Sequence, residues 1–136
     1  ASLVGSEMCI RDRWRSVEEN TIEILRGFDE IANVLDVAAQ NVGYDIEVIT
    51  KDGTHKYFEV KSVDNIGAPF SMTNNEFSAA VQYKEKYYLA IVNQSDNYIE
   101  ICFISDPINS LNMTKRVTKW EWYCNSYDGN YTKYIV

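Results

Sequence analysis

Two carboxylates and a lysine fall at a spacing that could build a hydrolytic centre. Asp45 follows Gly43-Tyr44, and fourteen positions later comes the triplet Glu59-Val60-Lys61. Two carboxylates brought together can hold a hard divalent cation such as Mg²⁺ (or Mn²⁺), which prefers oxygen ligands and retains waters. Such a cation neutralises charge on phosphate oxygens, and an ammonium beside it helps to orient the attacking water. The spacing therefore makes Asp45, Glu59 and Lys61 candidates for phosphodiester hydrolysis.

The same spacing also has a purely structural interpretation. Charged residues that alternate with apolar ones commonly form the solvent-facing side of a sheet. On spacing alone a solvated sheet face is the commoner explanation, so the catalytic hypothesis needs further support.

A β-hairpin must position these side chains. Apolar and polar residues alternate from Tyr44 to Ile49 and again from Tyr57 to Lys61, on either side of Asp52-Gly53. A two-residue loop would send Asp45 and Glu59 to opposite faces of the hairpin. We therefore predict a three-residue loop of Asp52, Gly53 and Thr54, or an equivalent bulge. The predicted faces are Asp45, Glu59 and Lys61 on one side and Ile46, Val48, Phe58 and Val60 on the other.

The elements around the hairpin follow from hydrophobic period and capping signals. Apolar spacing from Ser16 predicts a helix over residues 16–40, with Ser16 and Glu19 as a capping box. A short strand is predicted over 69–72, and Thr73 to Glu76 forms a second capping box that opens a helix to about residue 84. Strands over 87–93 and 98–105 follow, and an aromatic hairpin around Asp128-Gly129 closes the chain. This order predicts an α/β (α+β) fold, a sheet flanked by helices.

Length and charge limit the classes of protein. The 136 residues suit one compact domain, and the net charge of −7 is the wrong sign for binding nucleic acid through bulk electrostatics. Five basic residues could form a local stripe: Lys84, Lys86, Lys115, Arg116 and Lys119. The three cysteines and single histidine are too few for a disulfide scaffold or a triad, and no membrane-spanning segment or signal peptide is visible. We therefore expect a cytoplasmic protein with no membrane partner.

The N-terminus is predicted to stand apart from the fold. Residues 7–13 (EMCIRDR) resemble a translated sequencing adaptor, so residues 1–13 are interpreted as a non-native tail and 14–136 as a single domain. If an adaptor replaced coding sequence, an upstream ATPase or DNA-binding partner is missing or separate.

Several ordered blocks resemble a known family. They are Gly43-Tyr44-Asp45-Ile46, Phe58-Glu59-Val60-Lys61-Ser62, Pro69-Phe70-Ser71-Met72-Thr73, Asn75-Glu76 and the strand 87–92. In this order they are similar to the Mrr-like, protein NO VEIN C-terminal domain family of the PD-(D/E)xK nuclease superfamily. The resemblance covers residues 18–111 and implies a restriction-endonuclease-like mixed sheet. It also implies a Mg²⁺-dependent endonuclease that acts on nucleic acid, namely DNA, in prokaryotic defence or restriction.

The resemblance assigns roles residue by residue. Asp45 and Glu59 match the metal-binding carboxylates, and Lys61 matches the catalytic lysine. Asn75 and Glu76 match the family's Asn-Glu pair as possible accessory residues, although Glu76 also has the structural role of completing a capping box. The superfamily's acidic residue on the first helix would be Glu19 or Glu23, for which solvation on the helix surface is the competing interpretation.

Two functions therefore stay open. The domain is either a nuclease that depends on a missing or separate partner for its affinity to nucleic acid, or a catalytically silent nucleic-acid-binding or protein-interaction module of a larger defence protein. A homodimer is a possible assembly. The net charge of −7 fits a DNA-binding enzyme poorly. The complete set of Asp45, Glu59 and Lys61 favours the nuclease, because a silent module has no need for three converging charges.

Overall fold

A five-stranded mixed sheet organises the domain. The computed structural model describes residues 10–136, with side chains from Val17 onward. The strands lie in the order β1-β2-β3-β4-β5, and every neighbouring pair is antiparallel except β3 and β4, which are parallel. The strands are β1 (Ile31–Asp36), β2 (Ile46–Thr50), β3 (His55–Ser62), β4 (Tyr87–Gln94) and β5 (Ile99–Ser105). The helices are α1 (Ile10–Arg26), η1 (Ala38–Gln40), α2 (Asn74–Tyr83), η2 (Lys84–Lys86) and α3 (Pro107–Ser110).

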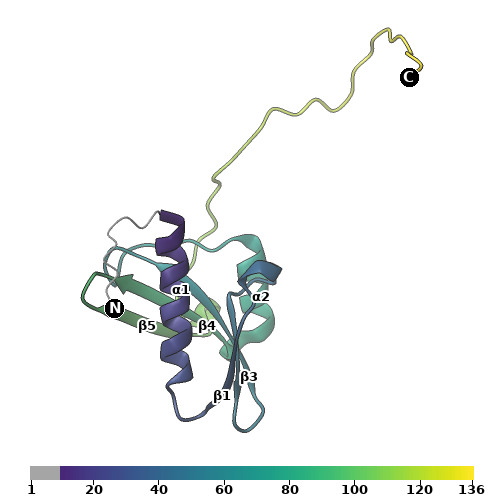
Figure 1. The fold of residues 1–136 in the computed structure, drawn as a ribbon. Helices are drawn as coiled ribbons and strands as arrows, with labels where there is room; N and C mark the ends of the chain where they lie inside the picture. Colours follow the sequence, from purple (N-terminus) through teal and green to yellow (C-terminus); the bar gives the residue numbers. More distant parts are fainter. Residues whose placement is uncertain (1–9) are drawn as a thin grey trace.

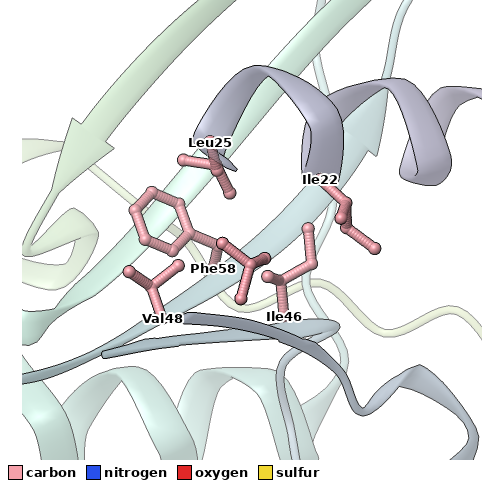
Figure 2. Close-up of a cluster of buried hydrophobic side chains, with 6 residues drawn as sticks. Ile22, Leu25, Ile46, Val48 and Phe58 are labelled. Atoms are coloured by element: carbon pink, nitrogen blue, oxygen red, sulfur yellow. The ribbon is translucent and has the colours of Figure 1, made fainter. Parts of the chain in front are cut away.

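Helices cover both faces of this sheet, which gives the α+β fold predicted from the sequence (Figure 1). Ile22 and Leu25 of α1 pack onto side chains of β2 and β3, which point up toward the helix in Figure 2. On the other face, Ala79 and Ala80 of α2 pack against Tyr87 and neighbouring residues of β4. Burial on both faces fixes which side chains of β3 point toward which helix, because successive residues of a strand alternate between faces.

The predicted helix over residues 16–40 is wrong at both ends. The chain is helical from Ile10 only to Arg26, so Ser16 lies inside α1 instead of capping it, and residues 10–13 of the predicted tail are helical. Beyond Gly27 the chain forms the edge strand β1, which pairs antiparallel with β2. In this segment the backbone forms hydrogen bonds to β2 instead of continuing the hydrogen bonds of the helix. Residues 1–9 of the predicted tail lie outside the described residues.

The segment before α2 also differs from the prediction. Residues 69–72 form no strand; instead Phe70 and Met72 pack against the core on the α2 side of the sheet. The capping box after them is confirmed. The Thr73 hydroxyl accepts a hydrogen bond from the Glu76 amide at 3.2 Å, and the Glu76 carboxylate accepts one from the Thr73 amide at 3.1 Å.

The predicted aromatic hairpin at the end of the chain is not formed. Residues 112–136 contain no helix or strand, and they run away from the domain in Figure 1. A two-stranded hairpin is marginal in water unless it packs on another layer, and Leu111 is the last residue that packs on the core. Within the described residues no helix is long and apolar enough to cross a bilayer.

Candidate active site between β2, β3 and α2

The hairpin loop between β2 and β3 sets the register of the site. Ile46 faces Phe58 and Ile49 faces His55, which leaves a three-residue loop of Lys51, Asp52 and Gly53. The amide of Thr50 donates to the carbonyl of Thr54 at 2.9 Å and closes the loop. The predicted odd length is confirmed, whereas the loop residues lie one position earlier than predicted. Gly53 accepts the left-handed backbone conformation, with φ of 85°.

This register separates charged from apolar side chains as predicted. Ile46, Val48 and Phe58 belong to the buried cluster beneath α1, and Val60 packs beside them. The alternate residues point to the face that α2 covers. The Asp45, Glu59 and Lys61 side chains therefore meet on one face of the sheet.

Asp45 and Glu59 contact each other in a largely buried setting. A side-chain hydrogen bond joins the two carboxyl groups, and only 5% of Glu59 is exposed. Asp45 is held from two directions: its amide donates to the Phe58 carbonyl at 2.9 Å, and its Oδ2 accepts from the Val60 amide at 2.9 Å. Two ionised carboxylates cannot hydrogen-bond to each other, so a shared proton or a bound cation must neutralise the pair.

The pKa values of Asp45 and Glu59 reflect the unfavourable placement of two carboxyl groups together in a buried site. Burial, followed by the negative charges of Asp45 and Glu76, raises the pKa of Glu59 to about 9. Burial also raises the pKa of Asp45, while the hydrogen bond from the Val60 amide opposes the rise. Glu59 is thus the carboxyl that holds the proton at neutral pH when no cation is present, and it donates to Asp45.

Lys61 lies beside the pair and is oriented by α2. Its Nζ is 3.5 Å from Glu59 Oε2 and 2.6 Å from Glu76 Oε1. The Glu76 Oε1 atom also accepts the Thr73 amide of the capping box. The two interpretations of Glu76 are therefore compatible, since one carboxylate caps α2 and binds Lys61.

Tyr87 and Gly43, to which the sequence assigned no role in the site, position the chain just before Asp45. The buried Tyr87 hydroxyl donates to the Gly43 carbonyl at 2.8 Å. Gly43 has a φ of 93°, and a Cβ there would lie 2.7 Å from Ala79 Cβ. Only glycine combines this conformation with such close packing on α2. In the sequence, Tyr87 marks only the start of a predicted strand.

The remaining predicted accessory residues do not join the carboxylate pair. The Asn75 side chain donates to the Asn41 carbonyl at 2.9 Å, and so it tethers α2 to the loop before β2. Glu19 is exposed on α1, which packs on the opposite face of the sheet, and Glu23 on the same helix forms an ion pair with Arg26 at 2.6 Å. Neither glutamate adds a carboxylate beside Asp45 and Glu59.

The donor set fits a hard cation held largely by water. In the part of the chain that the structure describes, no group of three or more His, Cys, Asp or Glu side chains is arranged to hold a metal ion. Asp45 and Glu59 nevertheless supply adjacent oxygen donors whose mutual repulsion a cation would relieve. Mg²⁺ is commonly held by one or two carboxylates with waters and substrate phosphates completing its shell.

Comparison with known families places this site in context. The family model described as "Protein NO VEIN, C-terminal" matches residues 15–104. The chain belongs to the NO VEIN C-terminal domain family. The matched range of this NO VEIN C-terminal domain contains Asp45, Glu59, Lys61 and Glu76, and it ends within β5. Comparisons with curated proteins and with solved structures gave no significant match.

Proposed function

We propose that this NO VEIN C-terminal domain is a metal-dependent endonuclease that hydrolyses phosphodiester bonds in DNA, in prokaryotic defence or restriction. The observation that carries the proposal is the direct contact of Asp45 and Glu59 on one buried face, with the Lys61 ammonium 3.5 Å from Glu59. A solvated sheet face, the competing interpretation, would leave these groups apart in water. The resemblance to Mrr-like domains supports the defence role.

The residues of the site divide the work of hydrolysis. Asp45 and Glu59 would hold Mg²⁺ or Mn²⁺, which when bound supplies a Lewis acid that neutralises phosphate charge and lowers the pKa of water. Lys61 supplies a positive charge and three hydrogen-bond donors to a phosphate oxygen or to the attacking water. Glu76 directs the Lys61 ammonium toward the pair. Burial strengthens each of these interactions, because a site of low dielectric screens charge weakly.

Cleavage of plasmid, linear and modified DNA with Mg²⁺ or Mn²⁺ tests the proposal. Asp45→Asn and Glu59→Gln should abolish nicking, and Lys61→Met should slow it by about 100-fold or more. Glu85→Gln, the same substitution at an exposed glutamate on η2, is the matched control and should leave nicking unchanged. Equal background cleavage by wild type and Asp45→Asn on every substrate would contradict the proposal.

A silent nucleic-acid-binding or protein-interaction module is the second candidate. Two observations favour it: the net charge of −7, and the presence of two rather than three clustered carboxylate ligands among the described residues. Calorimetric titration with Mg²⁺ and Mn²⁺ separates the candidates, because the silent module requires no metal affinity at Asp45 and Glu59. Metal binding that Asp45→Asn abolishes would favour the nuclease.

A further inference from the structure

The segment that follows the domain exposes its aromatic side chains almost completely. Residues 114–136 are exposed throughout, and the segment extends away from the sheet in Figure 1. Trp122 is 91% exposed and Tyr131 is 90% exposed. The exposed aromatic residues of the segment are Trp120, Trp122, Tyr123, Tyr127, Tyr131 and Tyr134. So many large aromatic groups left in water indicate a binding surface.

The charge of this segment is opposite to that of the domain. Residues 112–136 contain four basic side chains and two acidic ones, a net charge of +2. Since the whole chain carries −7, residues 1–111 carry −9. Lys115, Arg116 and Lys119 directly precede the two tail tryptophans. Residues 112–136 would therefore attract a polyanion, whereas most of the domain would repel it.

Aromatic rings interleaved with cations suit unpaired nucleic acid better than a protein groove. Bases that are not paired stack on Trp and Tyr, while Lys and Arg follow the phosphate backbone. A segment that docks into a protein groove usually presents aliphatic anchors, and here the aliphatic residues are few: Val117, Ile135 and Val136. The composition and the charge thus point to the same ligand.

We propose that residues 114–136 are an arm that binds single-stranded nucleic acid, with bases stacked on its aromatic side chains and phosphates paired with Lys115, Arg116 and Lys119. The arm lies beyond the range matched by the family model, so it is a feature of this chain and not of the family match. The nine Cα-to-Cα steps from Leu111 to Trp120 can span about 30 Å, which is about the diameter of a small domain. The arm can therefore hold a strand beside the domain to which it is attached.

This inference deepens the proposed function, because it names the strand form of the substrate and the source of its affinity. It also explains how an acidic domain could meet DNA. Binding can be measured in EDTA, where no cleavage occurs. Binding of nucleic acid by the arm and the nuclease activity can therefore be tested independently. Glu85→Gln, which lies outside both the arm and the carboxylate pair, should bind as wild type does, whatever the outcome of the cleavage assay.

The test is fluorescence anisotropy of labelled oligo-dT of about 20 nucleotides, with oligo-rU and a duplex as further arms. In the full chain, Trp120→Ala with Trp122→Ala should raise the Kd for the single strands by about tenfold or more. Replacing Lys115, Arg116 and Lys119 by Ser should raise the Kd and reduce the salt slope by about 2, at about 0.7 per phosphate contact. Tyr98→Ala, an aromatic residue that is 55% exposed outside the arm, is the matched control.

Three results would contradict the proposal that the arm binds single strands. They are a wild type that binds no single strand at low salt, tryptophan variants that bind as tightly as wild type, and stronger binding of the duplex. Light scattering of the same proteins can give a fourth result that contradicts the proposal. If the tryptophan substitutions dissociate an oligomer and leave the Kd unchanged, the segment docks on a second copy of the chain instead. Tighter binding of oligo-dT than oligo-rU, lost with the tryptophans, would support the arm and favour DNA.

Discussion

Replacing Glu59 by Gln should stabilise the metal-free domain at alkaline pH. Gln is nearly isosteric with Glu, and its amide can donate to Asp45 as the protonated carboxyl does. Unlike Glu59, it is neutral at every pH. The substitution therefore removes the electrostatic conflict while leaving the packing and the hydrogen bond in place.

The magnitude follows from the raised pKa of Glu59. Its pKa is about 9 in the folded protein against an ordinary value of 4.5. A raised folded-state pKa contributes stability that is fully present below pH 4.5 and is lost as pH rises toward 9. Between pH 5 and pH 8 the loss is at most about 4 kcal/mol, at 1.36 kcal/mol per pH unit. Even about 1 kcal/mol would shift the Tm by about 4 °C.

Urea denaturation in EDTA at pH 5 and pH 8 measures this loss. Wild type should lose stability between the two values, whereas Glu59→Gln should lose much less. The exposed control Glu85→Gln should follow wild type. Added Mg²⁺ should restore wild type at pH 8 and have little effect on Glu59→Gln, because ligand binding to the native state stabilises it. Parallel pH profiles for wild type and Glu59→Gln would refute the reasoning.

The other substitutions distinguish effects on the stability of the fold from effects on the proposed cleavage. Glu76→Gln can still complete the capping box, so the Tm should change little. Cleavage should fall about tenfold or more, because the substitution removes the negative charge that orients the Lys61 ammonium. Thr73→Ala removes the cap hydroxyl and should cost about 1 kcal/mol in thermal denaturation. Tyr87→Phe leaves the buried Gly43 carbonyl without its donor and should cost about 1–3 kcal/mol in urea denaturation. Gly43→Ala should cost more than about 1 kcal/mol by the same assay, since positive φ and the α2 backbone both oppose a Cβ.

The features that sequence predicts well here are local ones. The hairpin follows from alternation on either side of Gly53, and the capping box at Thr73 follows from a four-residue pattern. The shift of the loop by one residue does not disturb the faces, because both loops have an odd length. Asp52 explains the shift: its carboxylate accepts from the Thr54 amide at 3.0 Å and from the Thr50 hydroxyl, which closes the turn earlier.

Strand β1 shows why the N-terminal region was predicted wrongly. Its register shifts between Ile31 and Asn33, so the strand lacks a regular period of two. The apolar residues Ile31, Val34 and Leu35 then fall three and four apart, which is also the spacing of a helix face. The apolar spacing in this bulged edge strand is therefore the same as the spacing expected if the preceding helix continued.

The long-range contacts of the site have no signal in a single sequence. The Lys61–Glu76 ion pair joins residues 15 apart, and the Tyr87–Gly43 hydrogen bond joins residues 44 apart. Both depend on how α2 and β4 fold back over the hairpin, which local propensity does not specify. The contacts of Glu76 with Lys61 and of Tyr87 with Gly43 could therefore be found only from the folded arrangement.

The short loop between β2 and β3 has a consequence for how the domain folds. Asp45, Glu59 and Lys61 come together through the most local strand pairing of the sheet, while the parallel pairing of β3 with β4 requires the whole α2 crossover. Local pairings close faster than distant ones. We therefore expect the two carboxylates to meet while the hairpin is still in water, before α2 buries them and Glu76 adds its negative charge. A proton or a divalent cation that joins the pair would ease its later burial beneath α2 and would so act as a folding aid.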